Sequence, residues 1–134
     1  MAKLAEIEGV GKVYADKLGK AGVKTVAKLL DEGATRIGRK RLADETGVSE
    51  KLVLKWVNRA DLDRIKGIST QYADLLEYSG VNTVPDLARR NAENLEARMT
   101  AVNGEKKLVR KVPSLKQVQG WIEQAGGLPR NITH

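Results

Sequence analysis

The sequence predicts an all-α fold made of two similar helical units fused in one chain. The first observation is an internal repeat, because residues 7–34 align without a gap on residues 65–92. The second is the spacing of apolar residues, which recur every three or four positions and form no alternating strand pattern. The third is composition: 41% hydrophobic residues with 4% aromatics and no Phe favour a core of small helices packed through Leu, Val, Ile and Ala.

The repeat defines the two units. Twelve of the 28 aligned pairs are identical, which is too many for chance, and most are glycine or apolar residues. In the first copy they are Ile7, Gly9, Tyr14, Ala15, Asp16, Leu18, Gly22, Val23, Thr25, Val26, Leu29 and Ala34. We expect a first unit at residues 1–62 and a second at 63–128, packed as one compact domain, with residues 129–134 as a flexible tail.

Stop and cap signals divide the first unit. A short helix and a glycine turn precede a helix predicted over 12–21, which Gly22 ends. Thr25 and Thr35 are natural N-caps, the second for a helix through residue 45. Gly47 breaks that helix, and Ser49 caps the next one, over 50–60.

The second unit follows the same order. We expect a helix over 70–79, a stop at Gly80 and an N-cap at Thr83. One longer helix follows over 93–109, with an interruption near Asn103 and Gly104 as the alternative. A last helix is predicted over 115–124. Trp56 and Trp121 occupy matching places in the final helices of the two units, and we expect both to be buried core anchors.

The turn at residues 7–11 alternates apolar residues with glycine and leads directly into a helix. Glycine permits positive φ and close backbone approach, and the first turn of a helix presents N–H groups beside the positive end of the helix dipole. Gly9, Val10, Gly11 and Lys12 therefore form a candidate phosphate site. The alternative is a tight corner whose glycines only let two helices pack closely.

Residues 4–18 resemble the helix-hairpin-helix motif. Residues 22–30 resemble the helix that continues it in recombinases and in the bacterial RNA polymerase α C-terminal domain. The resemblance implies a SAM-like, helix-hairpin-helix bundle that binds nucleic-acid backbone through its hairpin amides, without sequence specificity. The full pattern is similar, over essentially the whole chain, to a small bacterial family of duplicated helix-hairpin-helix proteins classed as a domain of unknown function, so it implies no assigned activity.

The second hairpin departs from the motif. Lys66, Gly67, Ile68, Ser69 and Thr70 form it, with Ser69 where the motif has its second glycine. Serine can cap the helix or offer its hydroxyl to phosphate, but a close backbone approach is less secure there. We expect the first hairpin to bind more strongly. Two competent hairpins would resemble tandem domains that contact both strands across the minor groove.

The charge balance favours an anionic partner. The chain has 24 basic and 17 acidic residues, a net charge of +7 and a pI near 9.7. One basic cluster comprises Arg36, Arg39, Lys40 and Arg41, and a second comprises Lys106, Lys107, Arg110 and Lys111. Each could supply phosphate contacts, and we expect those of the first cluster to add to the hairpin site. The alternative for each is a solvated helix face.

A weaker signal lies at residues 42–56, whose spacing resembles a helix-turn-helix. It would present Ser49, Glu50, Lys51, Leu54 and Lys55 to the major groove. The face lacks the Arg, Asn or Gln usual for base readout, so sequence-specific binding is the lesser hypothesis.

Catalytic and metal sites find no support in the sequence. There is no Cys, the one His is the last residue, and the paired carboxylates are neighbours in sequence. We therefore expect no enzyme activity, no catalytic residue, no metal, no cofactor and no small-molecule substrate. No apolar run is long enough to span a membrane, and the absence of Cys suits a cytoplasmic protein.

The sequence thus predicts a module that binds the backbone of nucleic acid, double-stranded DNA first, without sequence specificity. The main alternative is a protein–protein adaptor that uses the hairpins to contact a protein partner.

Overall fold

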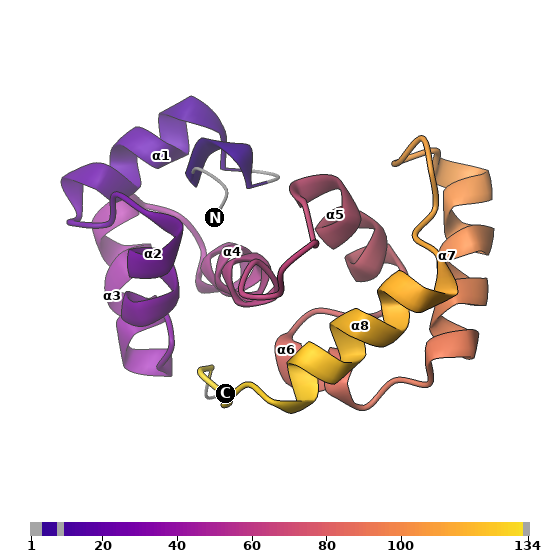
Figure 1. The fold of residues 1–134 in the computed structure, drawn as a ribbon. Helices are drawn as coiled ribbons and strands as arrows, with labels where there is room; N and C mark the ends of the chain where they lie inside the picture. Colours follow the sequence, from indigo (N-terminus) through magenta and orange to yellow (C-terminus); the bar gives the residue numbers. More distant parts are fainter. Residues whose placement is uncertain (1–3, 8–9, 133–134) are drawn as a thin grey trace. The chain divides into compact units, whose positions relative to one another are not determined.

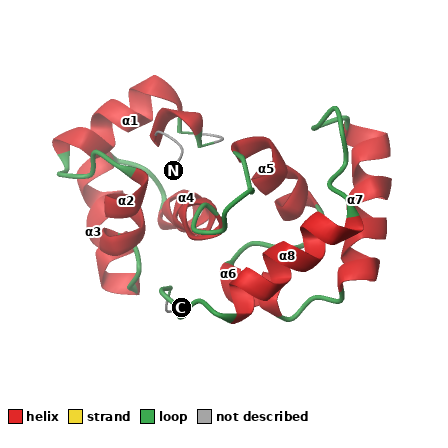
Figure 2. Cartoon of the chain, in the orientation of Figure 1, coloured by secondary structure: helices red, strands yellow, loops and turns green. Residues whose placement is uncertain are grey.

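The computed structural model describes residues 4–7 and 10–132, and every regular element in these ranges is helical (Figures 1 and 2). The elements are the 3₁₀ helix η1 (Leu4–Glu6), then α1 (Gly11–Lys20), α2 (Val26–Glu32), α3 (Arg36–Thr46), α4 (Glu50–Leu62), α5 (Thr70–Tyr78), α6 (Val84–Ala88), α7 (Ala92–Lys106) and α8 (Leu115–Gly126). The predicted all-α class is confirmed.

Side-chain caps begin the helices where the sequence predicts them. Thr25, Thr35, Ser49 and Thr83 each accept a hydrogen bond from the backbone N–H three residues later, at 3.0 to 3.3 Å. Such a cap satisfies one of the N–H groups that the first helical turn leaves open, and contributes about 1 kcal/mol.

The first compact unit comprises Met1–Asp61 together with Arg130–His134. Its core is built on α4, whose Val53, Trp56 and Val57 have no exposed surface. Helix α1 packs on η1 and α3, and α2 packs on α3. Ile132 is 3% exposed and joins this core, so the described end of the chain differs from the flexible tail expected at residues 129–134. Burial of its apolar side chain explains the difference.

The second unit comprises Leu62–Pro129. Helix α8 packs against α6 and α7, and α5 packs against α7. Trp121 of α8 is 3% exposed within the core of this unit. The prediction that Trp56 and Trp121 are core anchors is confirmed.

Local geometry recurs between the units at the offset of 58 residues. Gly22 has φ +92°, and the Val23 N–H donates to the Leu18 carbonyl oxygen at 2.8 Å, which closes the C-terminus of α1. In the second unit, Gly80 has φ +94°, and the Val81 N–H donates to the Leu76 carbonyl oxygen at 2.8 Å. In both units a tyrosine ring lies 5.3 Å from the tryptophan ring of the final helix.

Helix α7 is shorter than the sequence suggested. A helix was expected over 93–109, but α7 ends at Lys106, and Lys107 has the left-handed φ of +51°. The side-chain amide of Asn103 bonds both backbone groups of Val109, at 3.0 Å each. This clamp replaces the helical hydrogen bonds and turns the chain toward α8.

Candidate functional site

The first hairpin leads into α1, whose described part begins at Val10. The predicted contact Gly9 and its neighbour Glu8 lie outside the described residues. Val10 is 2% exposed, so its side chain belongs to the core and only its backbone could meet a ligand. Helix α1 begins at Gly11, with φ +59°, and both Gly11 and Lys12 are exposed. Its N-cap residue Val10 makes no side-chain cap, and its first turn has no acidic residue. The first turn of α1 therefore carries no negative side chain that would offset the positive end of the helix dipole.

The second hairpin is held by the core of its unit. Gly67 has φ +94°, and a Cβ there would lie 3.0 Å from the Trp121 Nε1 atom, so both the backbone conformation and the close packing favour glycine. Ile68 is 5% exposed. The Lys66 N–H donates to Gln124 Oε1 at 3.0 Å, and Gln124 Nε2 donates to the Lys66 carbonyl oxygen at 3.1 Å. The backbone of Lys66 is thus used internally, while its side chain is exposed.

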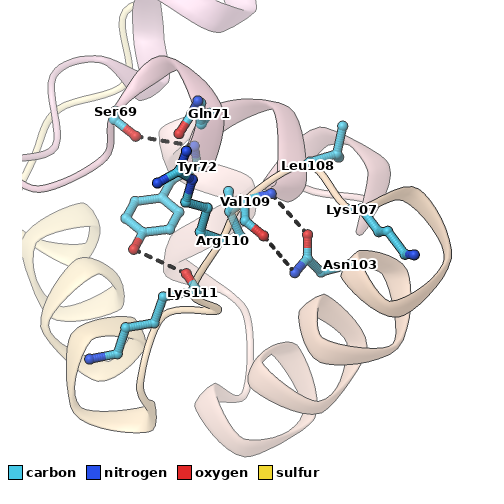
Figure 3. A pocket seen from close by; sticks show the side chains of 9 residues that line it. All are labelled: Ser69, Gln71, Tyr72, Asn103, Lys107, Leu108, Val109, Arg110 and Lys111. Atoms are coloured by element: carbon cyan, nitrogen blue, oxygen red, sulfur yellow. Dashed lines mark hydrogen bonds between the residues drawn. The ribbon is translucent and has the colours of Figure 1, made fainter.

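The start of α5 keeps some open donors. The Ser69 hydroxyl accepts the Tyr72 N–H at 3.3 Å and so acts as the N-cap (Figure 3). No described residue accepts a hydrogen bond from the N–H of Thr70 or Gln71. Ser69 and Gln71 are exposed and Thr70 is half-buried. These amides at the start of α5 are available to an anion.

The basic cluster of α3 is divided by the fold. Arg39 is 4% exposed, and its Nη1 atom donates to the carbonyl oxygens of Gly33 at 2.9 Å and Ala34 at 3.1 Å. Burial lowers the pKa of its guanidinium, with a smaller effect from the nearby Arg36. The Arg39 guanidinium therefore satisfies carbonyl groups that follow α2. Because this side chain is buried, the expectation that Arg39 contacts phosphate is wrong.

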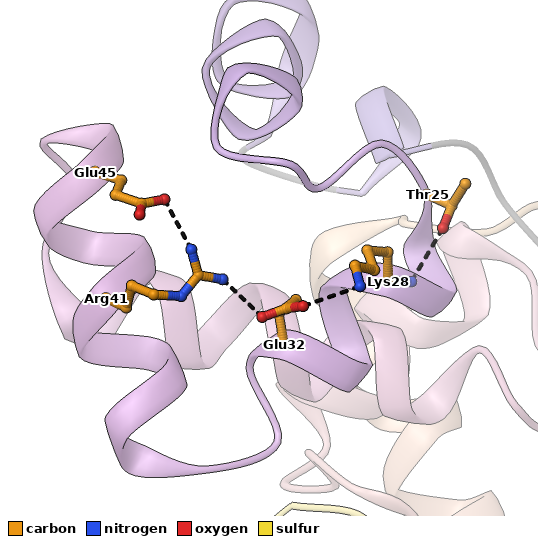
Figure 4. Close-up of polar contacts among 5 residues, drawn as sticks. All are labelled: Thr25, Lys28, Glu32, Arg41 and Glu45. Atoms are coloured by element: carbon orange, nitrogen blue, oxygen red, sulfur yellow. Dashed lines mark hydrogen bonds and ion pairs between the residues drawn. The ribbon is translucent and has the colours of Figure 1, made fainter.

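Arg41 is engaged in an ion-pair network (Figure 4). Its guanidinium binds Glu32 at 2.7 Å and Glu45 at 2.9 Å, and Lys28 binds the same Glu32 at 3.0 Å. Hydrogen bonds from Lys28 and then Arg41 lower the pKa of Glu32, and those to Glu32 and then Glu45 raise the pKa of Arg41. The charge of Arg41 is thus already balanced by carboxylates.

Arg36 and Lys40 are the members of this cluster that remain exposed. Arg36 and Lys40 are four residues apart and therefore lie on the same face of α3, whereas Arg39 is buried. For the helix-turn-helix hypothesis, Glu50, Lys51 and Lys55 of α4 are also exposed, while Leu54 is half-buried and Ser49 is the N-cap.

A cavity in the second unit contains Lys107, Arg110 and Lys111 of the second basic cluster, although the sequence did not predict the cavity itself. It has a volume of about 700 Å³ and lies beside the start of α5 and the segment that follows α7 (Figure 3). Its lining comprises Ser69, Gln71, Tyr72, Asn103, Lys107, Leu108, Val109, Arg110 and Lys111. The sequence signals that could have found it are the basic run at 106–111 and the helix-disfavouring Asn103.

No group of three or more metal-binding side chains occurs among residues 4–7 and 10–132. A search of the same residues finds no helix with the length and apolarity that crossing a bilayer requires.

Comparison with known proteins gives a family but no characterised relative. No curated protein and no solved structure matches the chain. Residues 8–128 match the family described as Domain of unknown function (DUF4332), a match that covers both helical units. The chain belongs to this family.

Proposed function

We propose that the protein binds the phosphate backbone of nucleic acid, double-stranded DNA first, without sequence specificity. The observation that carries the proposal is the start of α1, where the N-cap residue Val10 provides no side-chain cap, the first turn has no acidic residue and Lys12 is exposed. Open N–H groups at the positive end of a helix, beside a lysine, suit a phosphate oxygen.

Further cations support this proposal. Lys66, Arg36 and Lys40 are exposed and add to a net charge of +7. Long-range attraction of this kind increases the rate of encounter and gives an affinity that falls with salt. Arg39 and Arg41 are omitted from the interface because their guanidinium groups bind within the chain.

We further infer that the chain is a duplicated helix-hairpin-helix protein. The closing hydrogen bonds after Gly22 and Gly80, and the matching tyrosine–tryptophan pairs, support the duplication. The two hairpins differ, because α5 has the Ser69 cap and α1 has none. We therefore expect the first hairpin to bind phosphate more strongly than the second.

Two charge reversals on α1 test the clamp. Lys12→Glu should weaken binding of a labelled random-sequence duplex about tenfold at 0.1 M salt, because it replaces a phosphate contact with a repulsive carboxylate. Lys20→Glu is the matched control: it makes the same charge change in the last turn of α1 and should weaken binding only two- to threefold, an effect of net charge. Fluorescence anisotropy measures both, with thermal melts to verify folding. Equal losses for the two variants would contradict a clamp at the first hairpin.

A protein–protein adaptor is the second candidate, favoured by two exposed apolar side chains. Val13 of α1 is 67% exposed and Ile37 of α3 is 84% exposed. Single exposed apolar residues are common, so this observation is weaker than the helix end. An adaptor predicts that Lys12→Glu leaves any weak DNA affinity unchanged.

A further inference from the structure

The cavity of the second unit gathers three cations. Lys107, Arg110 and Lys111 are exposed in its lining, and the lining has no carboxylate (Figure 3). No ion pair within the described part of the chain uses any of the three. A lining with three basic residues and no carboxylate has a positive potential, so the cavity attracts an anion.

The backbone that carries these cations is fixed. The Asn103 amide bonds both the N–H and the carbonyl oxygen of Val109, at 3.0 Å each, and Val109 is 8% exposed. On the other side, the Tyr72 hydroxyl donates to the Lys111 carbonyl oxygen at 3.3 Å. Figure 3 shows both contacts, which fix the backbone on either side of Arg110. A fixed backbone loses less conformational entropy when an anion is bound.

Lys107 occupies a backbone conformation that disfavours it. Among the described residues it is the one non-glycine with positive φ, at +51°. At the end of α3 the same cap position is Gly47, with φ +73°. The two connections also differ in length: residues 47–49 join α3 to α4, whereas residues 107–114 join α7 to α8. The longer connection carries all three cations, and a lysine held at unfavourable φ is typical of a functional position.

We propose that this cavity binds a phosphate group. The guanidinium of Arg110 offers a fork of donors to two phosphate oxygens. The Lys107 and Lys111 side chains extend to either side of it and add long-range attraction (Figure 3). The open N–H of Gln71, which also lines the cavity, adds a donor. As to the source of the phosphate, the inference rests on the proposed function: the group is a backbone diester of bound DNA, held in addition to the hairpin contacts.

The first arm of the test uses inorganic phosphate and does not depend on DNA binding. Phosphate is titrated into ¹⁵N-labelled full-length protein while amide shifts are followed. Saturable shifts at Gln71, Val109, Arg110 and Lys111 are expected, and they should be lost in the Arg110→Gln/Lys111→Gln double variant. The matched control is Lys106→Gln/Lys116→Gln, which removes two exposed cations outside the cavity lining. Shifts that do not saturate, or that both double variants lose equally, would overturn the site.

The second arm uses random-sequence duplex DNA. The cavity double variant should weaken binding about tenfold at 0.1 M salt and reduce the slope of log affinity against log salt by nearly two, because about 0.9 is lost per phosphate contact. The control double variant should cost at most threefold. Phosphate binding with no loss of DNA affinity would overturn the diester as the ligand. If the wild type binds phosphate but no DNA, the proposed function fails and the phosphate site stands.

A third variant separates binding from packing. Lys107→Gly removes a cation and relieves the unfavourable φ, so its melting temperature should equal or exceed that of the wild type. Its affinity for inorganic phosphate should nevertheless fall two- to fivefold. An unchanged affinity would overturn the part assigned to Lys107.

Discussion

Glu32 determines whether two neighbouring cations are available to a ligand. Its carboxylate binds both Lys28 and Arg41, so two cations are directed toward the protein and not toward a ligand (Figure 4). The hydrogen bond from Lys28, followed by that from Arg41, holds the pKa of Glu32 below its usual value. A carboxylate with a lowered folded-state pKa contributes stability above its unfolded pKa, and this contribution is lost as the pH falls through the folded pKa.

Glu32→Gln should therefore make stability less sensitive to acid. The variant should melt below the wild type at pH 7, and the difference should shrink as the pH falls below about 4.3, the usual glutamate pKa. The effect should be small, because both cations and the carboxylate are partly exposed. Thermal melts from pH 7 to pH 3 measure it, with Glu123→Gln on the exposed side of α8 as the control. A difference between Glu32→Gln and wild type that stays constant across this range would contradict the network.

At the scale of elements, α2 and α3 approach closely at Gly38. A Cβ at this position would clash with the carbonyl oxygen of Glu32, the last residue of α2. The Thr35 hydroxyl caps α3 at the Gly38 N–H, at 3.1 Å. The glycine thus lets the corner between the two helices close, and the corner in turn positions Arg36 and Lys40 on α3.

Gly38→Ala should destabilise the protein by about 2 kcal/mol or more, because the backbone of α2 must move to make room for the methyl group. This loss exceeds the gain of about 1 kcal/mol that alanine brings to a helix interior. Gly19→Ala is the control, since a Cβ at Gly19 in α1 meets no atom within 4 Å, and it should be neutral or stabilising. Urea unfolding measures both changes, and equal effects would contradict the close approach.

The sequence predicted elements well where local chemistry decides them. The caps at Thr25, Thr35 and Thr83 depend on one side chain and a nearby N–H, so the pattern alone suffices. The end of α7 was placed three residues late, because the clamp from Asn103 to Val109 is a contact that no periodicity shows. Element boundaries that depend on such side-chain contacts need the structure.

The candidate site was predicted less completely, for a related reason. Basic residues adjacent in sequence look equivalent, but successive residues of a helix point about 100° apart, so Arg39 is buried while Lys40 is exposed. The cavity joins Gln71 to Arg110, residues far apart in sequence, and only the packing of α5 near the end of α7 brings them together. Gly11 and Lys12 are adjacent in sequence, so the pattern alone could single them out, and their contact with phosphate stays a prediction.

At the scale of the whole molecule, the chain divides into two compact helical units with a net charge of +7. The proposed phosphate-binding surface should tolerate any base sequence, because its contacts would reach the backbone and not the base edges. Its affinity should depend strongly on salt, because each phosphate contact releases condensed counterions.

The measurement that tests this account most directly is the binding of the wild-type protein to a labelled random-sequence duplex across a salt series. We expect micromolar or tighter binding at low salt, a linear fall of log affinity with log salt at about 0.9 per phosphate contacted, and equal competition by unlabelled duplexes of different sequence. Absence of binding at the lowest salt would contradict backbone binding. Competition by one sequence alone would contradict the lack of specificity and would favour sequence-specific binding through the exposed face of α4.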